Sequence, residues 1–149
     1  MMKLDDALAG VANLCFDSAP VIYFIEAHPR YDSLVTAVFE RVKRSALVGW
    51  TSVVTLSEVL VHPILKADAH LQQQYRELLL NSDNFYMLSV NALVAERAAA
   101  LRANYRLRTP DALQLAVALE AGCEAFLCND GGLRRVTELR VLVLDDLEL

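Results

Sequence analysis

Short apolar runs alternate along the chain with longer amphipathic stretches. Five runs rich in β-branched and aromatic residues predict buried strands, which typically span about four to eight such residues. They cover residues 13–16, 47–54, 85–90, 125–128 and 141–144. Apolar positions at helical spacing predict six helices between these runs. The predicted helices cover residues 21–27, 33–45, 56–66, 70–80, 92–105 and 110–121.

The order of these elements predicts an α/β fold. Strands separated by helices, rather than by two-residue turns, form parallel sheets with right-handed crossovers. We therefore expect a three-layer domain with a central parallel sheet of about five strands flanked by helices. No repeat or Gly/Ser/Pro linker divides the chain, so residues 1–149 are interpreted as one domain, with residues 1–11 as an N-terminal extension.

Composition narrows the class of protein. A chain of 149 residues with 55% hydrophobic content can bury a core without disulfides or a structural metal. No apolar run has the ~18 residues of a membrane span, and the first ten residues carry acids where a secretory leader carries bases. The expectation is a soluble, cytoplasmic protein that does not contact a membrane.

The cysteines and histidines do not suggest a zinc site. Three cysteines lie in or beside apolar stretches, which predicts buried free thiols, and three histidines are scattered rather than paired. These residues are Cys15, Cys123, Cys128, His28, His62 and His70.

The net charge of −5 argues against strong nonspecific binding to nucleic acid, because such proteins usually carry a basic face. The objection weakens if several acids are gathered in one metal site, where a divalent ion offsets their charge.

Four acids are predicted to lie at one edge of the sheet. Asp17 directly follows the first strand, and Asp130 closely follows the fourth. Glu58 is placed in the first turn of the helix after the second strand, and Asp111 in the first turn of the helix before the fourth. Helix N-termini and strand C-termini share one edge of a parallel sheet, where ligands usually bind.

Each acid also has a purely structural interpretation. Thr55 and Glu58 fit a capping box, and Asp111 complements the dipole of its helix. Asp17 fits a helix cap, and Asp130 fits a turn. The gathering of all four acids at one edge favours the functional interpretation. Four facing carboxylates raise one another's pKa and cost stability unless a cation lies among them. Oxygen ligands favour Mg²⁺ or Mn²⁺, and such ions commonly act on phosphates, which predicts phosphodiester hydrolysis.

Four segments resemble, in order, the motifs of PIN domains over nearly the whole chain. They are LCFDSAPVIYFIE, TSVVTLSEVL, RTPDALQLAVALEAGCEAFLCND and VLVLDD. The resemblance implies a compact α/β fold and a Mg²⁺ or Mn²⁺ site with Asp17, Glu58, Asp111 and Asp130 as catalytic, metal-holding carboxylates. It also implies cleavage of RNA, often by a VapC-type toxin that a small antitoxin protein holds inactive.

Two further positions match the family and one departs from it. Ser18 matches the hydroxyl residue beside the first acid, and Asn129 stands where Ser, Thr or Asn usually precedes the last; both are predicted to orient water or a ligand. Many members carry another acid where this chain has Gly132. A second metal is then expected to bind weakly, or only together with RNA phosphates.

Five arginines near the acids are candidates for binding RNA phosphates, although solvated surface charge is the ordinary role of such residues. They are Arg102, Arg106, Arg108, Arg134 and Arg135.

The helix predicted over 70–80 has apolar residues at 71, 75, 78 and 79, a spacing typical of core packing. With the apolar run 59–61, it also fits a groove for an antitoxin helix or a homodimer contact.

Acids at strand ends with Mg²⁺ also suit other functions. A receiver domain or an aspartate-nucleophile phosphatase is disfavoured, because no lysine follows a late strand and Asp17 does not begin an Asp-x-Asp motif. The alternative from another class is a non-catalytic PIN-fold module that binds RNA or protein. The sequence does not specify which RNA a nuclease of this kind cuts.

Overall fold

Five parallel strands form the central sheet in the order β4-β3-β2-β5-β6. The computed structural model describes all residues 1–149. The strands are β2 (Asn13–Phe16), β3 (Val48–Ser52), β4 (Phe85–Leu88), β5 (Ala125–Cys128) and β6 (Arg140–Val143). Cys15 of β2 pairs with both Trp50 of β3 and Phe126 of β5, so β2 is the middle strand.

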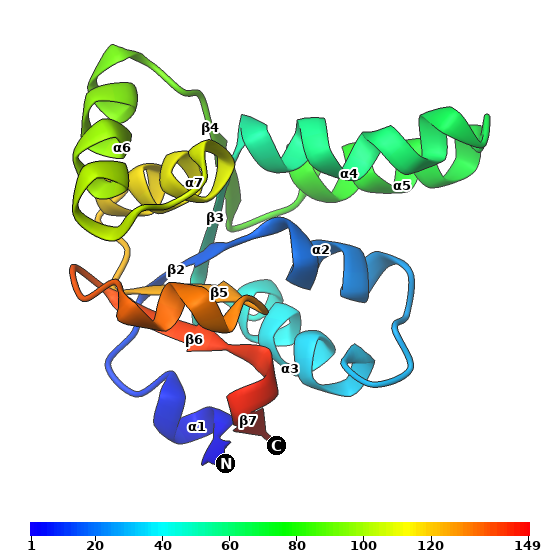
Figure 1. The fold of residues 1–149 in the computed structure, drawn as a ribbon. Coiled ribbons are helices and arrows are strands. Elements are labelled where there is room, and N and C mark those ends of the chain that lie inside the picture. The colour runs from blue at the N-terminus through cyan, green and yellow to red at the C-terminus, as the bar shows by residue number, and fades with distance from the viewer.

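Helices cover both faces of this sheet (Figure 1). They are α1 (Leu4–Ala7), α2 (Ser18–Ile25), α3 (Asp32–Lys43), α4 (Val53–Leu65), α5 (Ala69–Asn81), α6 (Ala92–Tyr105) and α7 (Thr109–Glu120). Two short 3-10 helices, η1 (Gly131–Arg135) and η2 (Leu144–Asp146), flank β6. None of the helices has the length and apolarity needed to cross a bilayer.

The alternation of side chains along each strand produces two cores. Leu14 and Phe16 of β2 point into a cluster shared with α2 and α3, whereas Cys15 points into one shared with α6 and α7. Successive side chains of a strand point to opposite faces of the sheet, so one strand contributes to both clusters. The predicted three-layer α/β fold is confirmed.

Helices α4 and α5 form an antiparallel pair that extends beyond the sheet (Figure 1). Tyr75 and Leu79 of the predicted apolar stripe are fully or almost fully buried in the first cluster, and Leu71 and Leu78 pack partly against it. The stripe is therefore core packing. The exposed apolar side chains of the pair are Val61, Ile64, Leu65 and Leu80.

Two helices begin three residues earlier than predicted. Helix α4 begins at Val53, because the Ser52 side chain caps it and accepts from the Val54 amide at 3.1 Å. Helix α2 begins at Ser18, with Asp17 as its cap. Glu58 therefore lies in the second turn of α4, and the predicted capping box of Thr55 and Glu58 is wrong.

The first eleven residues form part of the core. Strand β1 (Met2–Lys3) pairs in parallel with β7 (Leu147–Glu148), so the two chain ends lie side by side (Figure 1). Leu4 and Leu8 are buried in the first cluster, and Arg140 donates to the Ala7 carbonyl at 2.7 Å. The three cysteines are buried free thiols, as predicted.

Candidate active site at the carboxyl edge of the sheet

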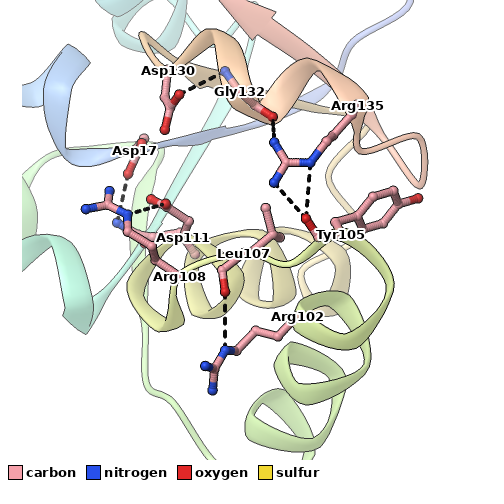
Figure 2. A network of polar contacts seen from close by, with 10 residues as sticks. Asp17, Arg102, Tyr105, Leu107, Arg108, Asp111, Asp130, Gly132 and Arg135 are labelled. Carbon is pink, nitrogen blue, oxygen red and sulfur yellow. Dashed lines mark hydrogen bonds and ion pairs between the residues drawn. The ribbon is translucent and has the colours of Figure 1, made fainter.

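The ends of β2 and β5 and the starts of three helices bring the predicted acids to one edge. Asp17 caps α2, and Asp130 caps η1. Asp111 lies in the first turn of α7. Figure 2 shows Asp17, Asp111 and Asp130 near one another, with Arg108 between α7 and the strand ends. Glu58 is close enough to repel the charge of Asp17.

Asp17 is held by two donors in an unfavourable environment for its charge. Its Oδ1 accepts from the Ser18 amide at 2.9 Å and from Gln114 Nε2 at 3.3 Å. Burial raises the pKa of Asp17 to about 6, with repulsion from Asp111 and Glu58 adding to the rise and the two hydrogen bonds opposing it. A cation at this position would favour the ionised carboxylate.

Arg108 acts as a counterion to the acids. Its Nε lies 3.1 Å from Asp111 Oδ2, and the Asp111 side chain is only 13% exposed, whereas Arg108 is 77% exposed. The hydrogen bond to Asp111 raises the pKa of Arg108, and attraction to Asp130 and Glu58 adds to this rise. One guanidinium therefore interacts with three of the four acids while remaining open to solvent.

Ser18 links the first two acids. Its hydroxyl donates to Glu58 Oε1 at 2.6 Å, and its amide donates to Asp17. The position of Ser18 agrees with its predicted supporting role, which remains to be tested by mutation.

Asn129 directly precedes Asp130, but its side-chain amide bonds residues other than the four acids. Its Nδ2 donates to the Tyr23 hydroxyl at 3.2 Å, and its Oδ1 accepts from the Asp145 amide at 3.2 Å. Asp130 Oδ1 accepts from the Gly132 amide at 2.9 Å, so the residue in place of the additional family acid supplies a backbone donor. In this conformation Asn129 connects α2 to η2, and its role in orienting water or a ligand stays a prediction.

Of the five arginines predicted to bind phosphate, only Arg108 pairs with one of the four acids. Arg134 makes a bidentate pair with Asp146 at 2.7 and 2.8 Å. Arg135 binds the carbonyls of Tyr105 and Gly132, and Arg102 binds the Leu107 carbonyl at 3.3 Å (Figure 2). Arg106 is exposed in a left-handed backbone conformation at the end of α6.

The donor set fits a hard divalent cation. The groups at the edge are carboxylate and hydroxyl oxygens, which suit Mg²⁺ or Mn²⁺ better than zinc. No three of the Asp, Glu, His and Cys side chains converge closely enough to enclose an ion by themselves. An ion there would replace the exposed Arg108 as the charge that balances the acids.

Sequence reasoning missed the polar side chains beneath the acids. Ser52, Thr55 and Gln114 are fully buried and hydrogen-bonded to one another and to Asp17. One signal was present: Gln114 is the only polar residue in the apolar run from 112 to 119.

Residues 14–139 match the family model described as the PIN domain, a range that contains all four acids. The chain belongs to the PIN domain family. No curated protein sequence matches it.

Solved structures share the PIN fold over most of the chain. A toxin–antitoxin complex from Klebsiella pneumoniae is 23% identical with a TM-score of 0.69, covering 88% of this chain and 97% of that one. The DNA-bound VapBC2 of Rickettsia felis is 14% identical with a TM-score of 0.71, covering 88% and 98%. VapC20 of Mycobacterium tuberculosis, a toxin that cleaves the sarcin–ricin loop, is 17% identical with a TM-score of 0.67, covering 85% and 98%.

Proposed function

We propose that this PIN domain is a divalent-metal-dependent ribonuclease and the toxin of a toxin–antitoxin pair. The observation that carries the proposal is the gathering of Asp17, Asp111 and Asp130 at the carboxyl edge of the sheet, with Glu58 beside them. Similarity to toxins, one of which cleaves the sarcin–ricin loop, supports RNA as the substrate.

In the proposed mechanism, Asp17, Asp111 and Asp130 would supply the carboxylates for Mg²⁺ or Mn²⁺, and Glu58 with Ser18 would complete the site. Such an ion activates water as a nucleophile and stabilises charge on the attacked phosphate. Arg108, which pairs with Asp111 and is largely exposed, would be available to bind a phosphate oxygen of the RNA if a metal ion took its place beside the acids. Arginine suits this role because its planar group matches the geometry of phosphate.

The first test is cleavage of a mixed RNA pool with Mg²⁺ or Mn²⁺. We expect Asp111→Asn to lower the rate at least about a hundredfold with the fold retained, because metal catalysis depends on charged ligands. Asp83→Asn is the matched control, since Asp83 is an exposed acid outside the site. A chelator should stop cleavage by the unmodified chain. Equal rates for the unmodified chain and Asp111→Asn would refute the assignment.

A non-catalytic module that binds RNA or protein is the second candidate. The pairing of Arg108 with Asp111 favours it, because an internal cation balances the acids without a metal. Calorimetric titration with Mn²⁺ separates the two functions. A chain that binds RNA but neither binds Mn²⁺ nor cuts RNA is such a module.

The partner that we propose is a small antitoxin protein, and homodimerisation is proposed alongside it. Val61, Ile64, Leu65 and Leu80 on α4 and α5 are each more than half exposed. An amphipathic helix of a partner would bury such side chains. The similar structures that are toxin–antitoxin complexes support this assignment.

A further inference from the structure

A fully buried polar network lies directly beneath the acids. Thr51, Ser52, Thr55 and Gln114 have no exposed surface, and every one of them is hydrogen-bonded. Burying such groups costs free energy unless they are hydrogen-bonded, and apolar side chains of the same shape can replace a bonded pair with little or no loss of stability. Stability alone therefore does not explain why this network is polar.

The direction of the hydrogen bonds is set at Asp17, because an ionised Oδ1 only accepts and therefore faces the nitrogen of the Gln114 amide, which leaves Gln114 Oε1 to accept from Ser52. The Val54 amide can only donate, and it donates to Ser52 Oγ at 3.1 Å. The Ser52 hydroxyl in turn donates to Gln114 Oε1 at 2.5 Å. The amide of Gln114 is oriented with its two N–H groups toward Thr55 Oγ1, at 2.6 Å, and Asp17 Oδ1, at 3.3 Å.

Both donors to Asp17 reach the same oxygen. The Ser18 amide and Gln114 Nε2 each bind Oδ1, so Oδ2 takes no hydrogen bond from the protein. Thr55 also lies 3.4 Å from Ser18 Oγ, which donates to Glu58. The network thus contacts two of the four acids from below.

We infer that Gln114 is a positioning residue that occupies Oδ1 of Asp17 and leaves Oδ2 as the single oxygen for a divalent ion. The inference rests on the proposed metal-dependent nuclease. Mg²⁺ and Mn²⁺ suit one oxygen from each carboxylate in a near-octahedral shell, whereas Ca²⁺ also accepts both oxygens of one carboxylate. Gln114 therefore favours small ions over Ca²⁺ at this site.

The network itself is tested in the metal-free protein. Nuclear magnetic resonance of the glutamine side chains should show Gln114 amide protons that exchange slowly with solvent. The exposed Gln73 and Gln74 supply rapidly exchanging references. Rapid exchange at Gln114 would overturn the inference without bearing on the nuclease assignment.

Metal selectivity is tested with Gln114→Met, which keeps the volume and removes both donors. Calorimetry without RNA should show Mn²⁺ affinity falling about tenfold, a typical effect of losing a residue that orients a metal ligand. Ca²⁺ affinity should change less than twofold. Because buried Gln114 cannot touch RNA, kcat should fall while KM for RNA stays unchanged.

Two further variants separate positioning from general destabilisation. Val117→Ala weakens the buried face of the same helix without touching the network, so its Mn²⁺ affinity should equal that of the unmodified chain. Ser52→Ala combined with Gln114→Met also removes the hydroxyl that loses its acceptor in the single change. Because Ser52 caps α4 as well, the double variant is first checked for its fold by circular dichroism, and the folded protein should reproduce the loss of Mn²⁺ affinity.

The outcomes distinguish this inference from the proposed function. Unchanged Mn²⁺ and Ca²⁺ affinities in a folded Gln114→Met variant overturn the inference alone. If the unmodified chain binds no Mn²⁺, the metal site and the inference both fail.

Discussion

At the residue scale, the ionised carboxylate of Asp17 is energetically unfavourable in the folded chain. Burial and two neighbouring acids raise its pKa, although hydrogen bonds from Ser18 and Gln114 oppose the rise. A group selected only to cap α2 would be served as well by serine or asparagine, which carry no charge. The retained charge is consistent with a role in binding a cation.

The cost of this charge has a measurable dependence on pH. The pKa of Asp17 is raised from 3.8 to about 6, so the folded chain binds more protons than the unfolded chain between these values. Stability from the protonated carboxyl is fully present below about 3.8 and is lost as the pH rises through about 6. Metal-free Asp17→Asn should then be more stable than the unmodified chain at pH 8, by up to about 3 kcal/mol.

Urea unfolding monitored by the fluorescence of Trp50 measures this gain. The gain should shrink steadily from pH 8 toward pH 4, whereas Asp83→Asn should show no such trend. A gain that is independent of pH would mean that the Asp17 charge is not its source.

Site residues could be predicted from the sequence only where their position relative to a strand end or a helix start determines where they lie in the fold. The four acids follow strand ends or lie near helix starts, so their place at the sheet edge could be inferred from the amino-acid sequence alone. Gln114 could not be placed in this way, because its partners Ser52 and Asp17 are distant in sequence. Its network depends on how α7 packs against β3 and α2.

At the element scale, strand and helix order was predictable but boundaries were not. Val53 and Val54 have strong β propensity and extend the apolar run of β3, so the pattern predicted a longer strand. The structure instead ends β3 at Ser52, whose side chain satisfies an amide of the first turn of α4. A local hydrogen bond decided the boundary where hydrophobic periodicity is ambiguous.

Tyr75 is one of the buried residues that join the α4 and α5 pair to the body of the molecule. Its ring is fully buried, and its hydroxyl donates to Glu26 at the end of α2. Tyr75→Ala should cost about 3–5 kcal/mol through the cavity it leaves. Tyr75→Phe should cost about 1 kcal/mol through the lost hydrogen bond.

Urea unfolding also tests this expectation. Gln74→Ala on the exposed side of α5 is the control and should change the free energy of unfolding by less than about 0.5 kcal/mol. If Tyr75→Ala were as mild as this control, α5 would not depend on Tyr75 for its packing.

At the scale of the whole molecule, the segments at both ends complete the fold. The matched family range is 14–139, yet β1 and β7 lie outside it and pair with each other. Leu4 is 2% exposed, and Leu8 and Val11 are also buried. The sequence did not assign a role to residues 1–11, because so short an apolar segment has no periodicity that identifies its partner.

Leu4→Ala tests the contribution of this segment. We expect it to lower the free energy of unfolding by about 2–5 kcal/mol, as for other buried leucines. Asp6→Ala is the matched control, because Asp6 is exposed on the same short helix. Equal unfolding free energies for the two variants would show that the segment is not part of the cooperative core.

The strand order also has a consequence for biosynthesis. Strand β2 lies between β3 and β5, so Asp17 meets Asp111 and Asp130 only after the chain has been made through residue 130. Pairing of Met2 with Leu147 must wait for the last residues. Contacts so distant in sequence form late, because the intervening chain must first be ordered. A nascent chain on the ribosome therefore carries no assembled acid site until residue 130 has been made, so a ribonuclease of the proposed kind would be inactive before that point.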